Sequence, residues 1–119
     1  MLKELEPYQN RAKPIKYRLG DYNIITRDNV DLGCKHLKTL PHFKYVGGSF
    51  DCYNNHLTSL KGCPTSIGGD FDCNCNQLTS LEYCPTYVGD NFYCRHNNIN
   101  LSLPEGVIIQ GGFHNYAII

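Results

Sequence analysis

The sequence predicts a mainly-β solenoid, in which short strands from successive coils of the chain stack into a parallel sheet. The main observation is a spacing of 21 residues that several residue types share at once. A fixed period in this range is typical of repeat proteins, whose units bury their apolar side only against neighbouring units. The residues with this spacing are Phe50, Phe71, Phe92 and Phe113; Cys52, Cys73 and Cys94; Asn55, Asn76 and Asn97; Val46, Ile67, Val88 and Ile109; and Leu57, Leu78 and Ile99.

Length and charge narrow the classes of protein that fit. The chain has 119 residues and no net charge, which suits one domain. Residues 1–46 hold nine basic and five acidic residues, whereas residues 47–119 hold two basic and six acidic ones. A nucleic-acid binder would carry a basic stripe on its repeats, so the acidic repeats favour a protein partner with a basic surface instead. No apolar run approaches the roughly 20 residues that span a bilayer, and the charged N-terminus is unlike a signal peptide, so we expect a cytoplasmic protein without a membrane partner.

Five of the seven cysteines recur at equivalent positions of the repeats. Equivalent residues on neighbouring strands lie about 4.8 Å apart, which is slightly too far between Cβ atoms for a relaxed disulfide. We therefore expect buried thiols that act as small hydrophobic residues, in a reducing compartment. These cysteines are Cys52, Cys63, Cys73, Cys84 and Cys94.

The chain divides into an arm and one repeat domain. Prolines interrupt residues 1–14, so this segment is predicted to be a flexible basic arm. The domain at 15–119 begins with a predicted β-hairpin, because alternating apolar residues flank Gly20-Asp21, a pair suited to a type II′ turn. Such a hairpin would cap the first apolar layer, as solenoids require. The predicted parts are the hairpin cap at 15–26, repeats at 27–109 and a terminal strand at 110–119.

The first two full repeats follow the pattern G-G-x-F-x-C-x-x-N-x-L-T-S-L-x-x-C-P closely, whereas the third departs from it after Ile99. Phenylalanine and cysteine alternate, so both point inward from a short strand. The asparagine follows where the chain must turn, and its side chain is expected to satisfy backbone groups of that turn. The glycine pairs are expected either to take backbone angles closed to other residues or to allow close packing between coils. The short unit leaves little room for a helix, so we expect an irregular or 3₁₀ convex side.

The pattern C-x-x-N-x-L-T-S-L-x-x-C-P resembles the small leucine-rich repeat proteins of tailed bacteriophages and prophages, over about residues 30–117. The resemblance implies a leucine-rich repeat solenoid with about five short parallel strands on a concave face. It also implies a non-enzymatic protein-binding module. We therefore expect a phage-encoded protein that binds and modulates or inhibits a protein of its host, in the host cytoplasm, with a host defence factor as one such target.

Stacking of the repeats aligns the outward strand residues into columns, which predict the binding face. Like charges on neighbouring strands are destabilising, so a column of aspartates suggests selection for binding. Tyrosine and arginine are common anchors of protein interfaces, and they border this column. The predicted binding residues are Asp31, Asp51, Asp72, Tyr53, Tyr93, Arg95, His114 and Tyr116.

Two other classes of function remain open. Cys75, His96 and His114 suggest a metal-binding or catalytic protein, since thiolate and imidazole suit zinc. The apolar C-terminus suggests a scaffold that assembles through its uncapped end, most simply as a homodimer. The predicted self-association residues are Phe113, Ile118 and Ile119. We expect no cofactor and no metal for the favoured binding module.

Overall fold

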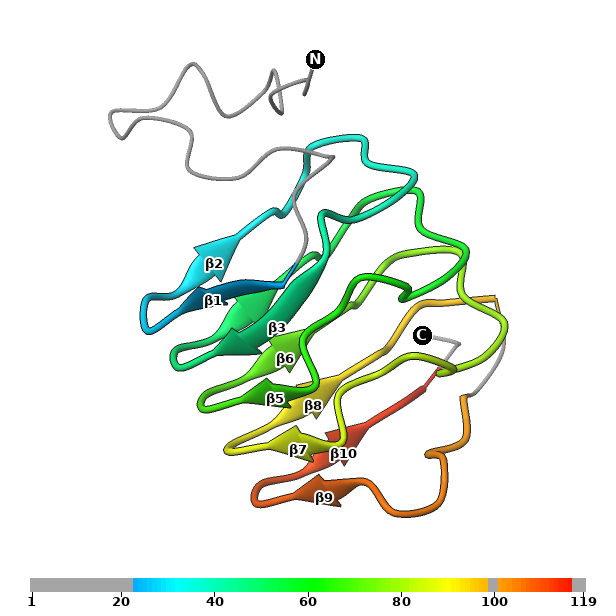
Figure 1. Cartoon of the computed structure of the whole chain (residues 1–119). Helices are drawn as coiled ribbons and strands as arrows, with labels where there is room; N and C mark the ends of the chain where they lie inside the picture. Colours follow the sequence, from blue (N-terminus) through cyan, green and yellow to red (C-terminus); the bar gives the residue numbers. More distant parts are fainter. Residues whose placement is uncertain (1–22, 99–100, 117–119) are drawn as a thin grey trace.

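The computed structural model describes residues 23–98 and 101–116, and it confirms a mainly-β repeat solenoid. In these residues ten short strands form two parallel sheets of five strands each, and no helix is present. Figure 1 shows the coils stacked from β1 and β2 at one end to β9 and β10 at the other, with tight turns joining the two sheets on one side and longer loops on the opposite side. The described residues contain no helix that is long and apolar enough to cross a membrane.

One sheet is the one that the repeat pattern predicts. Its order is β10-β8-β6-β4-β2, and each strand is parallel to its neighbour. The phenylalanines stand opposite one another along the sheet, from Phe50 to Phe113. The 21-residue period is therefore the register of the sheet. Its strands are β2 (Val30–Asp31), β4 (Phe50–Asp51), β6 (Phe71–Asp72), β8 (Phe92–Tyr93) and β10 (Phe113–His114).

The second sheet was not predicted, because the opposite side was expected to be irregular or 3₁₀. Its order is β1-β3-β5-β7-β9. Within each repeat the aliphatic residue of the period points inward and the residue before it points outward, which is the alternation of a strand. The loops between the sheets are irregular, as expected. The strands are β1 (Ile24–Thr26), β3 (Phe43–Val46), β5 (Ser66–Ile67), β7 (Tyr87–Val88) and β9 (Ile108–Ile109).

The predicted hairpin cap at 15–26 is described only in its last residues. Ile24–Thr26 form β1, which pairs in parallel with β3 and so belongs to the second sheet. The other arm of the hairpin, the arm at 1–14 and the terminal residues Ile118 and Ile119 lie outside the described residues. The predicted terminal strand is present as β10.

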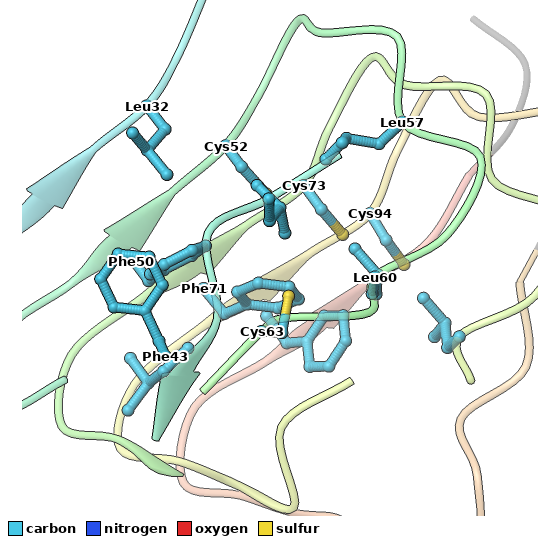
Figure 2. Close-up of a cluster of buried hydrophobic side chains, with 14 of the residues drawn as sticks. Leu32, Phe43, Phe50, Cys52, Leu57, Leu60, Cys63, Phe71, Cys73 and Cys94 are labelled. Carbon is cyan, nitrogen blue, oxygen red and sulfur yellow. The ribbon is translucent and has the colours of Figure 1, made fainter. Parts of the chain in front are cut away.

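The core is a column of aromatic rings flanked by aliphatic side chains and thiols (Figure 2). The ring centroids of Phe71 and Phe92 lie 4.9 Å apart, and those of Phe92 and Phe113 lie 5.3 Å apart, both edge to face. Edge-to-face pairs contribute about 0.5–1.5 kcal/mol beyond the area that they bury. Leu57 and Leu78 are fully buried beside them. The repeated residues thus form one continuous apolar layer from coil to coil.

The repeat cysteines are free thiols, as predicted. Cys52, Cys73 and Cys94 are fully buried in a row along the core (Figure 2), and Cys63 is also buried, while Cys84 is half-buried. Burial raises the pKa of Cys94 to about 12. Burial keeps these cysteines protonated, and the thiolate is the reactive form. They therefore serve as small core residues.

An asparagine ladder closes the turns that follow β4, β6 and β8. Asn76 is 7% exposed. Its Nδ2 donates to the carbonyls of Cys52 and Cys73 at 3.1 and 3.2 Å, and its Oδ1 accepts the N–H of Leu57 at 3.0 Å. Asn55 and Asn97 bond in the same way. Each side chain thereby joins its own coil to the preceding one, as the sequence predicted.

The glycine pairs allow close packing, and the alternative of special backbone angles is wrong for them. Positive φ among the glycines of the described residues occurs at Gly62 and Gly106 instead. A Cβ atom on Gly68 would lie 2.2 Å from the carbonyl oxygen of Gly47, and one on Gly89 would lie 2.1 Å from that of Gly68. The coils approach so closely here that only hydrogen fits between them.

Candidate protein-binding face

The outward face of the sheet β10-β8-β6-β4-β2 carries the predicted binding residues. Asp31, Asp51 and Asp72 stand opposite one another on adjacent strands, and Tyr93 and His114 continue the same column. The predicted alignment of these residues in one column is therefore confirmed. Its use in binding stays a prediction.

The aspartates also have a structural role that sequence reasoning missed. Each carboxylate accepts the backbone N–H of the residue two positions later: that of Gly33 for Asp31 and that of Tyr53 for Asp51, both at 3.0 Å. Asp72 accepts the N–H of Asn74 at 2.9 Å. Side chains of this type commonly close such local turns. Part of the cost of stacking like charges is thus offset by satisfied backbone groups, so binding is not the sole reason for the column.

The surroundings of Asp51 and Asp72 make their carboxyl groups harder to ionise than in water. Burial raises the pKa of Asp51 from its ordinary 3.8 to about 6; the N–H of Tyr53 opposes this shift, and Asp72 and Asp31 add to it. Burial also raises the pKa of Asp72, against the opposing effects of the Asn74 N–H and of the cation of Arg95. An approaching cation stabilises the charged form of such groups.

Arg95 lies among aromatic rings at the other end of the face. Its guanidinium carbon is 5.5 Å from the ring centre of Tyr93 and 5.8 Å from that of Tyr116, within the range of cation–π attraction. The rings of Tyr93 and His114 lie 4.8 Å apart and almost parallel. At Tyr93 the column has no carboxylate to accept the backbone N–H of the residue two positions later, Arg95. That N–H donates to Oδ1 of Asn74 at 2.6 Å. The four predicted residues Tyr93, Arg95, His114 and Tyr116 thus form one cluster.

Tyr53 lies over the acidic end of the face. A Cβ atom on Gly33 would fall 2.4 Å from the ring of Tyr53, so the ring rests against the bare glycine. A hydrogen bond with the Cys34 side chain, and the negative charge of its thiolate form, raise the pKa of the Tyr53 hydroxyl. The ring is exposed and available for contact.

The alternative site of Cys75, His96 and His114 is only partly assembled. Cys75 and His96 occupy equivalent corners of adjacent coils, both with left-handed backbone at φ 58° and 57°, whereas His114 stands in another column against Tyr93. Burial and the charge of Asp72 raise the pKa of Cys75, which is the opposite of what activates a nucleophilic thiol. Residues 23–98 and 101–116 contain no group of three or more His, Cys, Asp or Glu side chains placed to hold a metal ion.

The predicted self-association end is described in part. Phe113 is half-buried and packs against Phe92 of the preceding coil. Ile118 and Ile119 lie outside the described residues. Self-association through this end stays a prediction.

Sequence reasoning missed an apolar stripe on the second sheet. Ile25, Tyr45, Tyr87 and Ile108 share one column with Ser66, and all but Ser66 are exposed. The alternation of outward and inward residues before each glycine pair was the available indication. It also missed that the imidazoles of His36 and His56 lie together.

No protein-family model, curated protein or solved structure matches this chain.

Proposed function

We propose that the chain is a non-enzymatic binding module that receives a basic segment of a partner protein on the face defined by the aspartate column and the Arg95 cluster. The observation that carries the proposal is the raised pKa of Asp51 within a register-aligned column of carboxyls. A lysine or arginine placed between Asp51 and Asp72 would stabilise the charged carboxylates, which burial disfavours in the free protein. The favourable free energy of binding would come from pairing these carboxylates with a cation that the free protein lacks at this position.

The rest of the face supports the same proposal. Tyr53 and Tyr116 are exposed at its two ends, and Tyr93 and Arg95 lie between them. Aromatic residues and arginine in the centre of an interface contribute most of the binding energy. Charge complementarity with the acidic column would then set orientation and association rate.

The resemblance to phage leucine-rich repeat proteins extends the proposal to the kind of partner. A protein of the bacterial host with a basic surface fits the acidic face, because proteins that grip nucleic acid are basic where they contact phosphate. Binding there would block such a surface. This extension depends on the resemblance, whereas the binding face depends on the geometry.

The test is affinity capture from bacterial lysate, followed by measurement of the affinity for each purified captured protein. Asp51→Asn/Asp72→Asn is the informative variant, because asparagine keeps an oxygen that can accept the N–H of Tyr53 or Asn74. The fold is therefore expected to persist while the charge is lost. We expect affinity for a basic partner to fall at least tenfold, with a weaker dependence on salt.

The matched control is Glu82→Gln/Glu105→Gln, which removes two charges from exposed loop positions away from the sheet. It is expected to bind as the wild type does. Equal capture by the Asp51→Asn/Asp72→Asn variant and the wild type would contradict the proposed face. A Tyr93→Ala variant then tests the Arg95 cluster separately.

A further inference from the structure

His36 and His56 are held side by side by the coil geometry. They occupy the same repeat position, directly after Lys35 and Asn55, and Gln77 and Asn98 follow them in the next coils. The backbone N–H of His56 donates to the carbonyl of Leu37 at 2.8 Å, which fixes the two coils to each other at this point. His36 has left-handed backbone, with φ 57°. Both side chains are exposed.

The two imidazoles meet edge to edge. Nδ1 of His36 and Nε2 of His56 lie 3.4 Å apart, while the ring centres are 5.6 Å apart and the ring planes differ by 21°. The distance between the two nitrogens is shorter than the distance between the ring centres by about the width of one ring. Each nitrogen therefore points directly at the other. In the free protein one ring donates an N–H to the other.

We propose that His36 and His56 form a binding site for a divalent transition-metal ion. Metal–imidazole bonds are about 2.0–2.1 Å long. Two nitrogens 3.4 Å apart then subtend an angle of about 110° at a shared ion, which is the tetrahedral value that zinc sites prefer. The donating ring moves its proton to its other ring nitrogen, and modest rotation of the two exposed rings then aims both lone pairs at the ion.

The surroundings provide room for the remaining ligands. An open hollow of about 390 Å³ beside the pair is lined by Lys38, His56, Thr58 and Gln77. Water molecules in the hollow can complete the coordination. Gln77 is the next residue along the column, and its amide oxygen can serve as a further ligand. The ammonium group of Lys38 opposes a cation here, because like charges repel. Imidazole without thiolate suits Ni²⁺, Zn²⁺ and Cu²⁺.

The test is calorimetric titration of the purified chain with Ni²⁺, an ion that imidazole suits. His56→Gln copies Gln77 of the next coil, and His36→Asn supplies a residue that tolerates left-handed backbone, so both variants are expected to fold. Because losing only an outer partner of a metal ligand costs about 10–100-fold in affinity, we expect each variant to lose at least tenfold. Circular dichroism checks the fold of each variant.

Two controls separate this site from others. His96→Gln removes an exposed histidine elsewhere, and Cys34→Ser removes an exposed thiol; both are expected to bind Ni²⁺ as the wild type does. Lys38→Gln is expected to tighten Ni²⁺ binding, because it removes a repelling positive charge. If the hollow binds anions instead, the same variant would weaken its affinity for inorganic phosphate.

The proposal is overturned if the wild type binds no Ni²⁺, if either histidine variant binds it as tightly as the wild type, or if binding depends on Cys34. It does not depend on the acidic face, which lies in other columns of the repeat.

Discussion

Replacing Asn76 with alanine tests whether the asparagine ladder holds the coils together. In the folded protein the Asn76 side chain donates to the carbonyls of Cys52 and Cys73 and accepts the N–H of Leu57. The two carbonyls keep a second donor each, from Asn55 and Asn97. The principal loss is therefore the acceptor of the buried Leu57 N–H.

The magnitude follows from that loss. A buried donor left without a partner costs about 1–3 kcal/mol, and each lost hydrogen bond contributes about 0.5–1.5 kcal/mol. We expect Asn76→Ala to lower the free energy of unfolding by about 2–4 kcal/mol, out of a total of about 5–15 kcal/mol for a domain of ordinary stability. Asn76→Asp is expected to be at least as harmful, since a carboxylate cannot donate to the carbonyls that Nδ2 contacts.

The assay is equilibrium unfolding in urea, followed by far-UV circular dichroism and by tyrosine fluorescence, because the chain has nine tyrosines and no tryptophan. With a denaturant dependence of about 2 kcal/mol per molar urea, the midpoint is expected to fall by about 1–2 M. The control is Asn98→Ala, which removes an exposed side chain bonded to the carbonyl of Gln77 and is expected to cost about 0.5 kcal/mol or less. Equal midpoints for Asn76→Ala and Asn98→Ala would refute a stabilising role of the ladder.

Two further predictions concern packing and pH. Gly68→Ala places a Cβ against the backbone of Gly47 and is expected to lower the free energy of unfolding by about 3 kcal/mol, the upper end for an overpacked site. Gly106→Ala, which meets no atom within 4 Å and strains only its positive φ, is expected to cost about 1 kcal/mol, so equal losses would argue against close coil packing. The folded-state pKa of Asp51 is raised to about 6 from an ordinary 3.8, so the folded protein binds this proton more tightly and stability is expected to fall as pH rises from about 4 to about 6. Because Asp51 is only half-buried, solvent screening limits the effect to about 1 kcal/mol. Asp51→Asn is expected to flatten this pH dependence in urea unfolding, and an unchanged pH profile would show that Asp51 ionises normally.

Much of the architecture follows from the periodic residues alone. Because parallel strands in a solenoid pair residue for equivalent residue, the spacing of Phe50, Phe71 and Phe92 is also the register of the sheet. The buried thiols and the asparagine ladder follow by the same reasoning, since residues that recur at one position must meet one environment. The aspartate column could be predicted for this reason too.

Only the tertiary structure shows the contacts that form between residues at different positions of the repeat. The aliphatic residues Val46 and Ile67 showed the period, but only the fold shows that the flanking backbone pairs into a second sheet. The carboxylate of Asp51 turns back to its own strand, because the N–H of Tyr53 is the donor that it meets there. His36 and His56 share a position in the sequence, yet the distance between their nitrogens depends on side-chain orientation, which periodicity does not determine.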